Sequence, residues 1–282
     1  MAAALMALGI VATGTEAADP PAWAQPTPAF HVAGPIWYVG TKGLASYLIK
    51  TPSGAVLIDG TLAQNVVAIL ANLNRVGVRP RQVRQLLLTH AHFDHAAGLA
   101  GLERATGAPL AVGARDAEAV RTGTPPGETD YGVIRFPPAR VARAMSDGDV
   151  VRLGGLTLTA VATPGHTPGC TSWATRIVDQ GRAHDVIFLC SLSVAGNRLV
   201  GNRRYPGIVN DYRETFRRLG RVHADIVLPA HPELADVLER GRRAAAGGRD
   251  AFVDPTLLQR MVSEARVDFE KELVRQQRAT RR

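Results

Sequence analysis

The chain has 282 residues, of which 46% are hydrophobic and 21% charged, as is typical of a globular protein. No apolar run approaches the roughly 18–20 residues that a membrane helix needs, and glycine and proline are too few for a fibrous or low-complexity protein. The net charge is +8, but the arginines behind it are scattered and only 5% of residues are aromatic. This pattern favours a solvated basic surface over a nucleic-acid interface.

The N-terminus carries an apolar run, residues 2–14, followed by small residues. This pattern is typical of a secretory signal, although a frayed or buried helix is the alternative. We expect residues 1–24 to be a signal peptide and residues 25–282 to be the mature domain. The cleavage site is predicted at Ala22-Trp23-Ala24, with Thr15-Glu16-Ala17 as a second candidate.

Short apolar strands then alternate with helices, which predicts one mixed α/β domain. Strands are predicted at residues 37–39, 44–49, 55–58, 86–88, 150–153, 156–162, 171–178, 186–189 and 226–228. Helices are predicted near residues 62–73, at 96–105, at 210–219 and at 258–273. The apolar stripe of the last helix is expected to pack in the core. Residues 122–141 and 196–207 are predicted as long loops, which in a compact domain are functional lids or disordered segments.

The segment LLLTHAHFDHAAGL, residues 86–99, places His90, His92, Asp94 and His95 within six residues at the end of a predicted strand. Residues two apart on an extended backbone point the same way, so His90 and His92 should face one centre. The turn into the following helix should aim Asp94 and His95 at a neighbouring centre. Imidazole and carboxylate ligands together suit zinc, with iron or manganese as alternatives.

Two further histidines lie in the same kind of position, at the end of a predicted strand. His166, in TPGHTPG, and His231, in LPAHPE, each follow a predicted strand directly. His31, His184 and His223 have no such context and are expected to be structural or surface residues.

Cys170 and Cys190 are the two cysteines of the chain. Pairing is open to them in an oxidising compartment, but both lie in predicted core strands, so we expect free buried thiols. Neither a phosphate-binding loop nor a G-x-S-x-G elbow, an H-E-x-x-H helix or an S-x-x-K motif occurs, which argues against covalent serine chemistry.

With these residues the sequence resembles the metallo-β-lactamase superfamily, whose signature is H-x-H-x-D-H, and within it subclass B3. The likeness is carried by WYVGTKGLASYLI, GAVLIDG, LLLTHAHFDHAAGL, TPGHTPGCTSW, SLSVAGNRLVGNRRYP, DYRETFRRL and LPAHPE. The resemblance implies an α/β fold, the αββα four-layer sandwich, with two Zn²⁺ ions at one edge of its sheets. It assigns the first zinc to His90, His92 and His166, and the second to Asp94, His95 and His231.

The stretch after the strand at 186–189 discriminates within the superfamily. Related thioesterases and lactonases place a metal-bridging aspartate there, and subclass B1 lactamases a cysteine ligand. Here the chain reads Cys190-Ser191-Leu192-Ser193, which matches the serines of subclass B3. Cys190 falls one place earlier and is expected to point into the core.

The resemblance further implies a reaction in which a metal-bridging hydroxide attacks the β-lactam carbonyl, because zinc lowers the pKa of bound water to about 7. Asp94 and His92 are the predicted catalytic residues, and Ser191 and Ser193 the predicted substrate-binding residues. Asp59 and Thr89 are expected to orient ligands, with an ordinary turn as the alternative for Asp59. Trp37 and Tyr131 are candidates for lining the cleft, with core packing as the alternative for Trp37.

The expected activity is hydrolysis of the β-lactam amide bond of penicillins, cephalosporins and carbapenems, which would confer antibiotic resistance. The expected protein is a periplasmic monomer that binds a small-molecule β-lactam and neither nucleic acid nor membrane. Another hydrolase of the same fold, such as an acyl-homoserine lactonase or a thioesterase, is the alternative, and a nucleic-acid processing protein is a more distant one.

Overall fold

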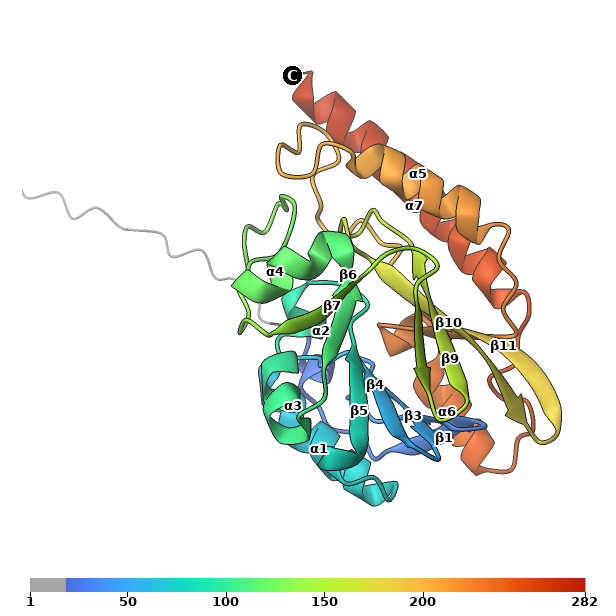
Figure 1. Cartoon of the computed structure of the whole chain (residues 1–282). Coiled ribbons are helices and arrows are strands. Elements are labelled where there is room, and N and C mark those ends of the chain that lie inside the picture. The colour runs from blue at the N-terminus through green and yellow to red at the C-terminus, as the bar shows by residue number, and fades with distance from the viewer. Residues whose placement is uncertain (1–18, 282) are drawn as a thin grey trace, which may run out of the picture.

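Two β-sheets lie face to face in the computed structural model, which describes residues 19–281 (Figure 1). The first sheet has the order β1 (Phe30–Ala33), β2 (Ile36–Tyr38), β3 (Tyr47–Thr51), β4 (Gly54–Ile58), β5 (Val83–Leu87), β6 (Leu110–Gly113) and β7 (Val141–Met145). The second has the order β12 (Ile226–Pro229), β11 (Arg182–Leu189), β10 (Thr171–Asp179), β9 (Leu156–Ala162) and β8 (Val150–Leu153). Strands β1 to β4 are antiparallel, β4 to β7 parallel, and β12 pairs in parallel with β11.

Helices cover the outer face of each sheet (Figure 1). The helices are α1 (Val66–Arg75), α2 (Phe93–Ala96), α3 (Leu99–Thr106), α4 (Ala117–Thr122), α5 (Ile208–Leu219), α6 (Val237–Ala245) and α7 (Leu257–Thr280). Short 3-10 turns are η1 (Pro21–Trp23), η2 (Ala63–Asn65), η3 (Pro80–Gln82), η4 (Ala114–Asp116) and η5 (Pro232–Ala235). Helices α1, α3 and α4 pack on the first sheet, and α5 and α7 on the second. The predicted αββα sandwich is therefore confirmed.

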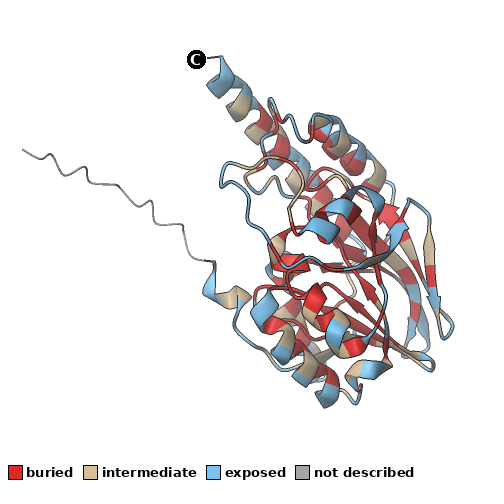
Figure 2. Ribbon diagram, turned by 60° about the vertical axis from the view of Figure 1, so that its left-hand side comes forward, coloured by how far each residue is buried: buried red, intermediate tan, exposed pale blue. Residues whose placement is uncertain are grey.

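The layering follows from alternation along the strands. In β4, Val56 and Ile58 join the core between the two sheets, whereas Ala55 and Leu57 pack under the helices of the first sheet. Successive strand residues point to opposite faces, so a strand apolar at every position is buried on both sides. Buried residues accordingly concentrate in the sheets, and the outer helix faces are exposed (Figure 2).

The predicted strands and long helices are present, with shifted ends. Besides the single turn of α2 and the short 3-10 turns, the elements that sequence reasoning missed are β1, β6, β7, α4 and α6. Strand β7 lies at a sheet edge and buries only Met145 fully, so it lacks the alternation that marks a strand. Strand β6 is four small or aliphatic residues long, too short to distinguish from a helix fragment.

The prediction that both cysteines are free thiols is wrong, because Cys170 and Cys190 form a disulfide. Cys170 immediately precedes β10 and Cys190 immediately follows β11, and these strands are antiparallel neighbours. The two Cα atoms lie 6.0 Å apart, within the range that a disulfide spans. Both residues are buried, as predicted, but their pairing depends on which strands are neighbours.

The predicted signal peptide falls largely on residues 1–18, which lie outside the described residues. Within residues 19–281, the helices are all too short or too polar to traverse a bilayer.

Candidate metal centre

Six histidine and aspartate side chains, of the types that bind metals, converge at one edge of the sandwich, where strands of both sheets end. His90 and His92 follow β5, and Asp94 and His95 lie on the single turn of α2. His166 lies in the loop between β9 and β10, and His231 directly follows β12. The structure thus brings together the six side chains that the sequence singled out as ligands.

The first cluster consists of His90, His92 and His166. One ligand atom from each lies within 4.8 Å of the others, and all three side chains are buried. His92 Nδ1 and His166 Nε2 are 3.0 Å apart. Two imidazoles at this distance direct ring nitrogens at the same small volume.

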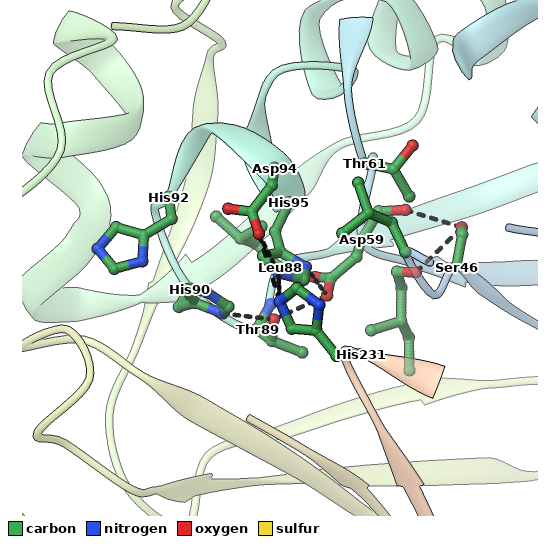
Figure 3. A network of polar contacts seen from close by, with 12 residues as sticks. Ser46, Asp59, Thr61, Leu88, Thr89, His90, His92, Asp94, His95 and His231 are labelled. Atoms are coloured by element: carbon green, nitrogen blue, oxygen red, sulfur yellow. Dashed lines mark hydrogen bonds and ion pairs between the residues drawn. The ribbon is translucent and has the colours of Figure 1, made fainter. Parts of the chain in front are cut away.

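The second cluster consists of Asp94, His95 and His231 (Figure 3). Asp94 Oδ2 lies 3.2 Å from His95 Nε2 and 3.3 Å from His231 Nε2. The two imidazole Nε2 atoms are 3.2 Å apart. The clusters are neighbours, because the ring centroids of His90 and His95 are 4.2 Å apart.

The donor set fits metal ions. His90 Nε2 is fully buried and has no hydrogen-bond partner in the described part of the chain, while His90 Nδ1 is taken by the Thr89 hydroxyl. Leaving buried nitrogens unpaired costs about 1–3 kcal/mol each, so such atoms call for a ligand. Histidine nitrogens with one carboxylate are the ligand chemistry of zinc.

The electrostatics of the clusters differ. Burial lowers the pKa of the first-cluster histidines, that of His92 to about 4, so these imidazoles are neutral near pH 7 and free to bind metal. Burial alone would raise the pKa of Asp94, but the charge of His95 and hydrogen bonds from His231 and His95 hold it well below its usual value. Burial likewise opposes the charged form of His95, yet the carboxylates of Asp94 and Asp59 raise its pKa to about 10. The second cluster therefore has a field that attracts cations.

Asp59 and Thr89 contact the rings of His95 and His90, as expected of residues that orient ligands. Asp59 accepts hydrogen bonds of 2.7 Å from the Thr89 backbone N–H and from its hydroxyl, and lies 3.3 Å from His95 Nδ1. The Thr89 hydroxyl is 3.0 Å from His90 Nδ1. Asp59 has a φ of 63°, an uncommon conformation for a non-glycine residue that these bonds stabilise. Asp59 and Thr89 thus each hold the Nδ1 atom of one histidine ring, which leaves the Nε2 atom of that ring facing the centre.

Asp116 has an equivalent positioning role that sequence reasoning missed. Its buried carboxylate accepts the backbone N–H of Ala91 at 2.9 Å, that of Gly169 at 2.7 Å and the Thr167 hydroxyl at 2.6 Å. It thereby joins the His90–His92 segment to the loop that carries His166. Asp116 follows β6, and because that strand was not predicted, no local pattern placed the carboxylate here.

Residues 190–193, here called the serine turn, follow β11. The Ser191 and Ser193 hydroxyls are 3.0 Å apart. The Ser193 carbonyl accepts hydrogen bonds from His166 Nδ1 at 2.8 Å and from the Tyr212 hydroxyl at 2.6 Å, which fixes the turn relative to the first cluster. The Cys190 sulfur is bonded to Cys170, so this turn offers no thiolate.

Three aromatic residues have different relations to the centre. Trp23 was predicted within the export segment, but its ring centroid lies 5.6 Å from that of His231. Tyr131 lines a small hollow together with His92, as expected of a cleft residue. Trp37 instead packs beneath Lys50, whose Nζ is 5.5 Å from the ring centroid. Trp23 is therefore the aromatic residue at the centre that sequence reasoning missed.

The remaining histidines stay apart from the clusters. His31 and His223 are exposed, and His184 is buried within β11. Their prediction as structural or surface residues agrees with these positions.

Comparison with known proteins gives the family of this fold and site. The family model of the metallo-β-lactamase superfamily matches residues 40–231, more than half of the chain, and the chain belongs to this superfamily.

Solved structures of subclass B3 metallo-β-lactamases resemble the chain over nearly its whole length. BJP-1 of Bradyrhizobium japonicum is 38% identical with a TM-score of 0.87, over 92% of this chain and 98% of that one. FEZ-1 of Legionella gormanii is 35% identical with a TM-score of 0.84, over 90% of this chain and 98% of that one. Among curated proteins, a hydroxyacylglutathione hydrolase of Cereibacter sphaeroides is 30% identical over 61% of this chain. That match spans only 54% of the relative's length.

Proposed function

We propose that this hydrolase cleaves the amide bond of β-lactam antibiotics and so confers resistance to penicillins, cephalosporins and carbapenems. The observation that carries the proposal is the serine turn, which has two hydroxyls and no carboxylate and whose Ser193 carbonyl accepts a hydrogen bond from His166 of the first cluster. Similarity to subclass B3 enzymes over some nine-tenths of the chain supports it.

In this proposal His90, His92 and His166 hold one Zn²⁺, and Asp94, His95 and His231 a second. Bound zinc polarises a carbonyl oxygen and lowers the pKa of bound water to about 7. His92 and Asp94 are the proposed catalytic residues, because each would hold one of the two metal ions that act on the substrate. The Asp94 carboxylate, whose pKa is held well below its usual value, supplies the one anionic ligand of the second cluster, beside the imidazoles of His95 and His231.

The serine hydroxyls bind the substrate carboxylate in this proposal. Ser191 and Ser193 are already joined by a hydrogen bond, so little side-chain freedom is lost when one of them donates to an anion. His166 and Tyr212 fix the backbone of Ser193 by donating to its carbonyl. The carboxylate would then be held beside the clusters, with the lactam ring turned toward them.

Thioester hydrolysis is the second candidate, favoured by the likeness to a hydroxyacylglutathione hydrolase. The serine turn argues against it, because the bridging aspartate expected of such enzymes is absent after β11.

A substrate panel tests the choice between the two activities. The zinc-loaded protein should hydrolyse a chromogenic cephalosporin and a carbapenem with kcat/KM at least about 100-fold above those for an acyl-glutathione thioester and an acyl-homoserine lactone, a difference of about 2.7 kcal/mol. Kinetics with all four substrates on one preparation give the comparison. Preference for the thioester would reject the lactamase proposal in favour of the second candidate.

We further propose export to the periplasm as a monomer, after removal of the N-terminal segment. Of the two predicted cleavage sites, Thr15-Glu16-Ala17 suits the structure better. The Trp23 carbonyl accepts hydrogen bonds from Thr41 and Asn65, each 2.9 Å, and cleavage after Ala24 would remove this residue from the side of His231.

A further inference from the structure

A cavity of about 490 Å³ extends from the second cluster toward the C-terminal helix. His231, Ser191 and Ser193 line one end of it, so it opens at the centre itself. One face of α7 lines the other end. This cavity is more than a metal site requires, because His231 is the one member of the six ligands that lines it.

The face of α7 that lines the cavity is both apolar and acidic. Its residues recur every three or four positions, as one helix face requires. They are Met261, Glu264, Ala265, Asp268, Phe269, Glu272 and Arg275. The apolar stripe of this helix was expected to pack in the core, and Leu258, Val262, Phe269 and Leu273 do so. Met261 and Ala265 are only half-buried and form part of the cavity wall instead.

The cavity is negative on a chain that is positive overall. Four carboxylates and one guanidinium line it, a net charge of −3 against +8 for the whole chain. Arg275 is already paired with Glu272 at 2.6 Å. Within residues 19–281, Asp130 and Glu264 form no ion pair, and Asp268 pairs only with Lys271 on the same exposed turn. The wall therefore retains uncompensated negative charge.

We propose that this cavity receives a positively charged, alkylated nitrogen of the substrate, such as a quaternary ammonium or an amidinium. The proposal rests on the proposed lactamase function and specifies its substrate class. The carboxylates of Glu264, Asp268 and Asp130 attract the charge, and the half-buried Met261 and Ala265 side chains contact the alkyl groups. The same carboxylates repel a second anionic group on the substrate, which makes the cavity selective for zwitterions over dianions.

Two cephalosporins with the same acyl side chain test the proposal. Cefepime has a quaternary ammonium on its C3 arm, and cefotaxime a neutral acetoxymethyl group. The measured quantity is the ratio of kcat/KM for cefepime to that for cefotaxime, on zinc-loaded enzyme at low and high salt. Removing two charges, Glu264→Gln with Asp268→Asn, should lower this ratio about threefold to tenfold, as expected for two exposed charges that each contribute a modest amount. High salt should lower the ratio of the unmodified enzyme and change that of the variant less.

Glu270→Gln is the matched control, because it removes a carboxylate of the same helix that pairs with Arg213 outside the cavity. Its ratio should equal that of the unmodified enzyme, and thermal unfolding confirms that each variant is folded. If both cephalosporins are hydrolysed and the double variant keeps the ratio, the inference is wrong while the lactamase function stands. If the zinc-loaded enzyme hydrolyses neither, the lactamase function fails and the inference fails with it.

Discussion

Replacing Asp94 by alanine is expected to remove the metal of the second cluster and to lower kcat/KM for a β-lactam by at least about 100-fold, or about 2.7 kcal/mol. Asp94 is the only carboxylate of this cluster, and its Oδ2 atom lies within 3.3 Å of both imidazoles. Without it, His95 and His231 alone cannot complete a tetrahedral zinc site with one open position. Zinc content measured after dialysis should fall from two ions per chain to one.

The control is Asp185→Ala, which removes a carboxylate that pairs with the exposed Arg176 on β10. This variant should keep both metals and the full rate. Retention of two zinc ions by Asp94→Ala, with unchanged kinetics, would show that the proposed ligand assignment is wrong.

Replacing Cys170 and Cys190 together by alanine is expected to lower the free energy of unfolding by about 3 kcal/mol, because the disulfide closes a 20-residue loop. For a domain of this size that corresponds to a fall in Tm of about 6–12 °C. The loop includes the whole of strands β10 and β11, so its constraint acts on two neighbouring strands of the second sheet. Thermal unfolding of protein produced in an oxidising compartment measures the effect.

Adding a reductant distinguishes the contribution of the disulfide bond to stability from that of side-chain packing. It should lower the Tm of the unmodified protein toward that of the double variant, and leave the double variant unchanged. Two thiols that react with a thiol reagent in the unreduced protein, together with an unchanged Tm on replacement, would contradict the disulfide.

Local sequence patterns were sufficient to predict which histidine and aspartate side chains lie together. His90, His92, Asp94 and His95 lie within six residues, and His166 and His231 each follow a strand. Strand ends in an α/β fold meet at common edges, so side chains at those ends can be grouped from the sequence alone. The sandwich itself followed from the resemblance that these motifs carry.

Residues that act through long-range contacts could not be predicted in this way. Asp116 contacts Ala91 and Gly169, which are 25 and 53 positions away. The disulfide likewise depends on the antiparallel pairing of β10 with β11. The small, apolar neighbours of Trp23 in the sequence favour an export signal. The position of Trp23 beside His231 is a long-range contact, which no local pattern predicts.

Metal analysis combined with chelator-sensitive kinetics is the decisive measurement for a dinuclear zinc lactamase. The purified mature chain should contain two zinc ions and hydrolyse a chromogenic cephalosporin and a carbapenem. A chelator should abolish both reactions, and added Zn²⁺ should restore them. Two bound zinc ions without chelator-sensitive lactam hydrolysis would contradict the proposed function.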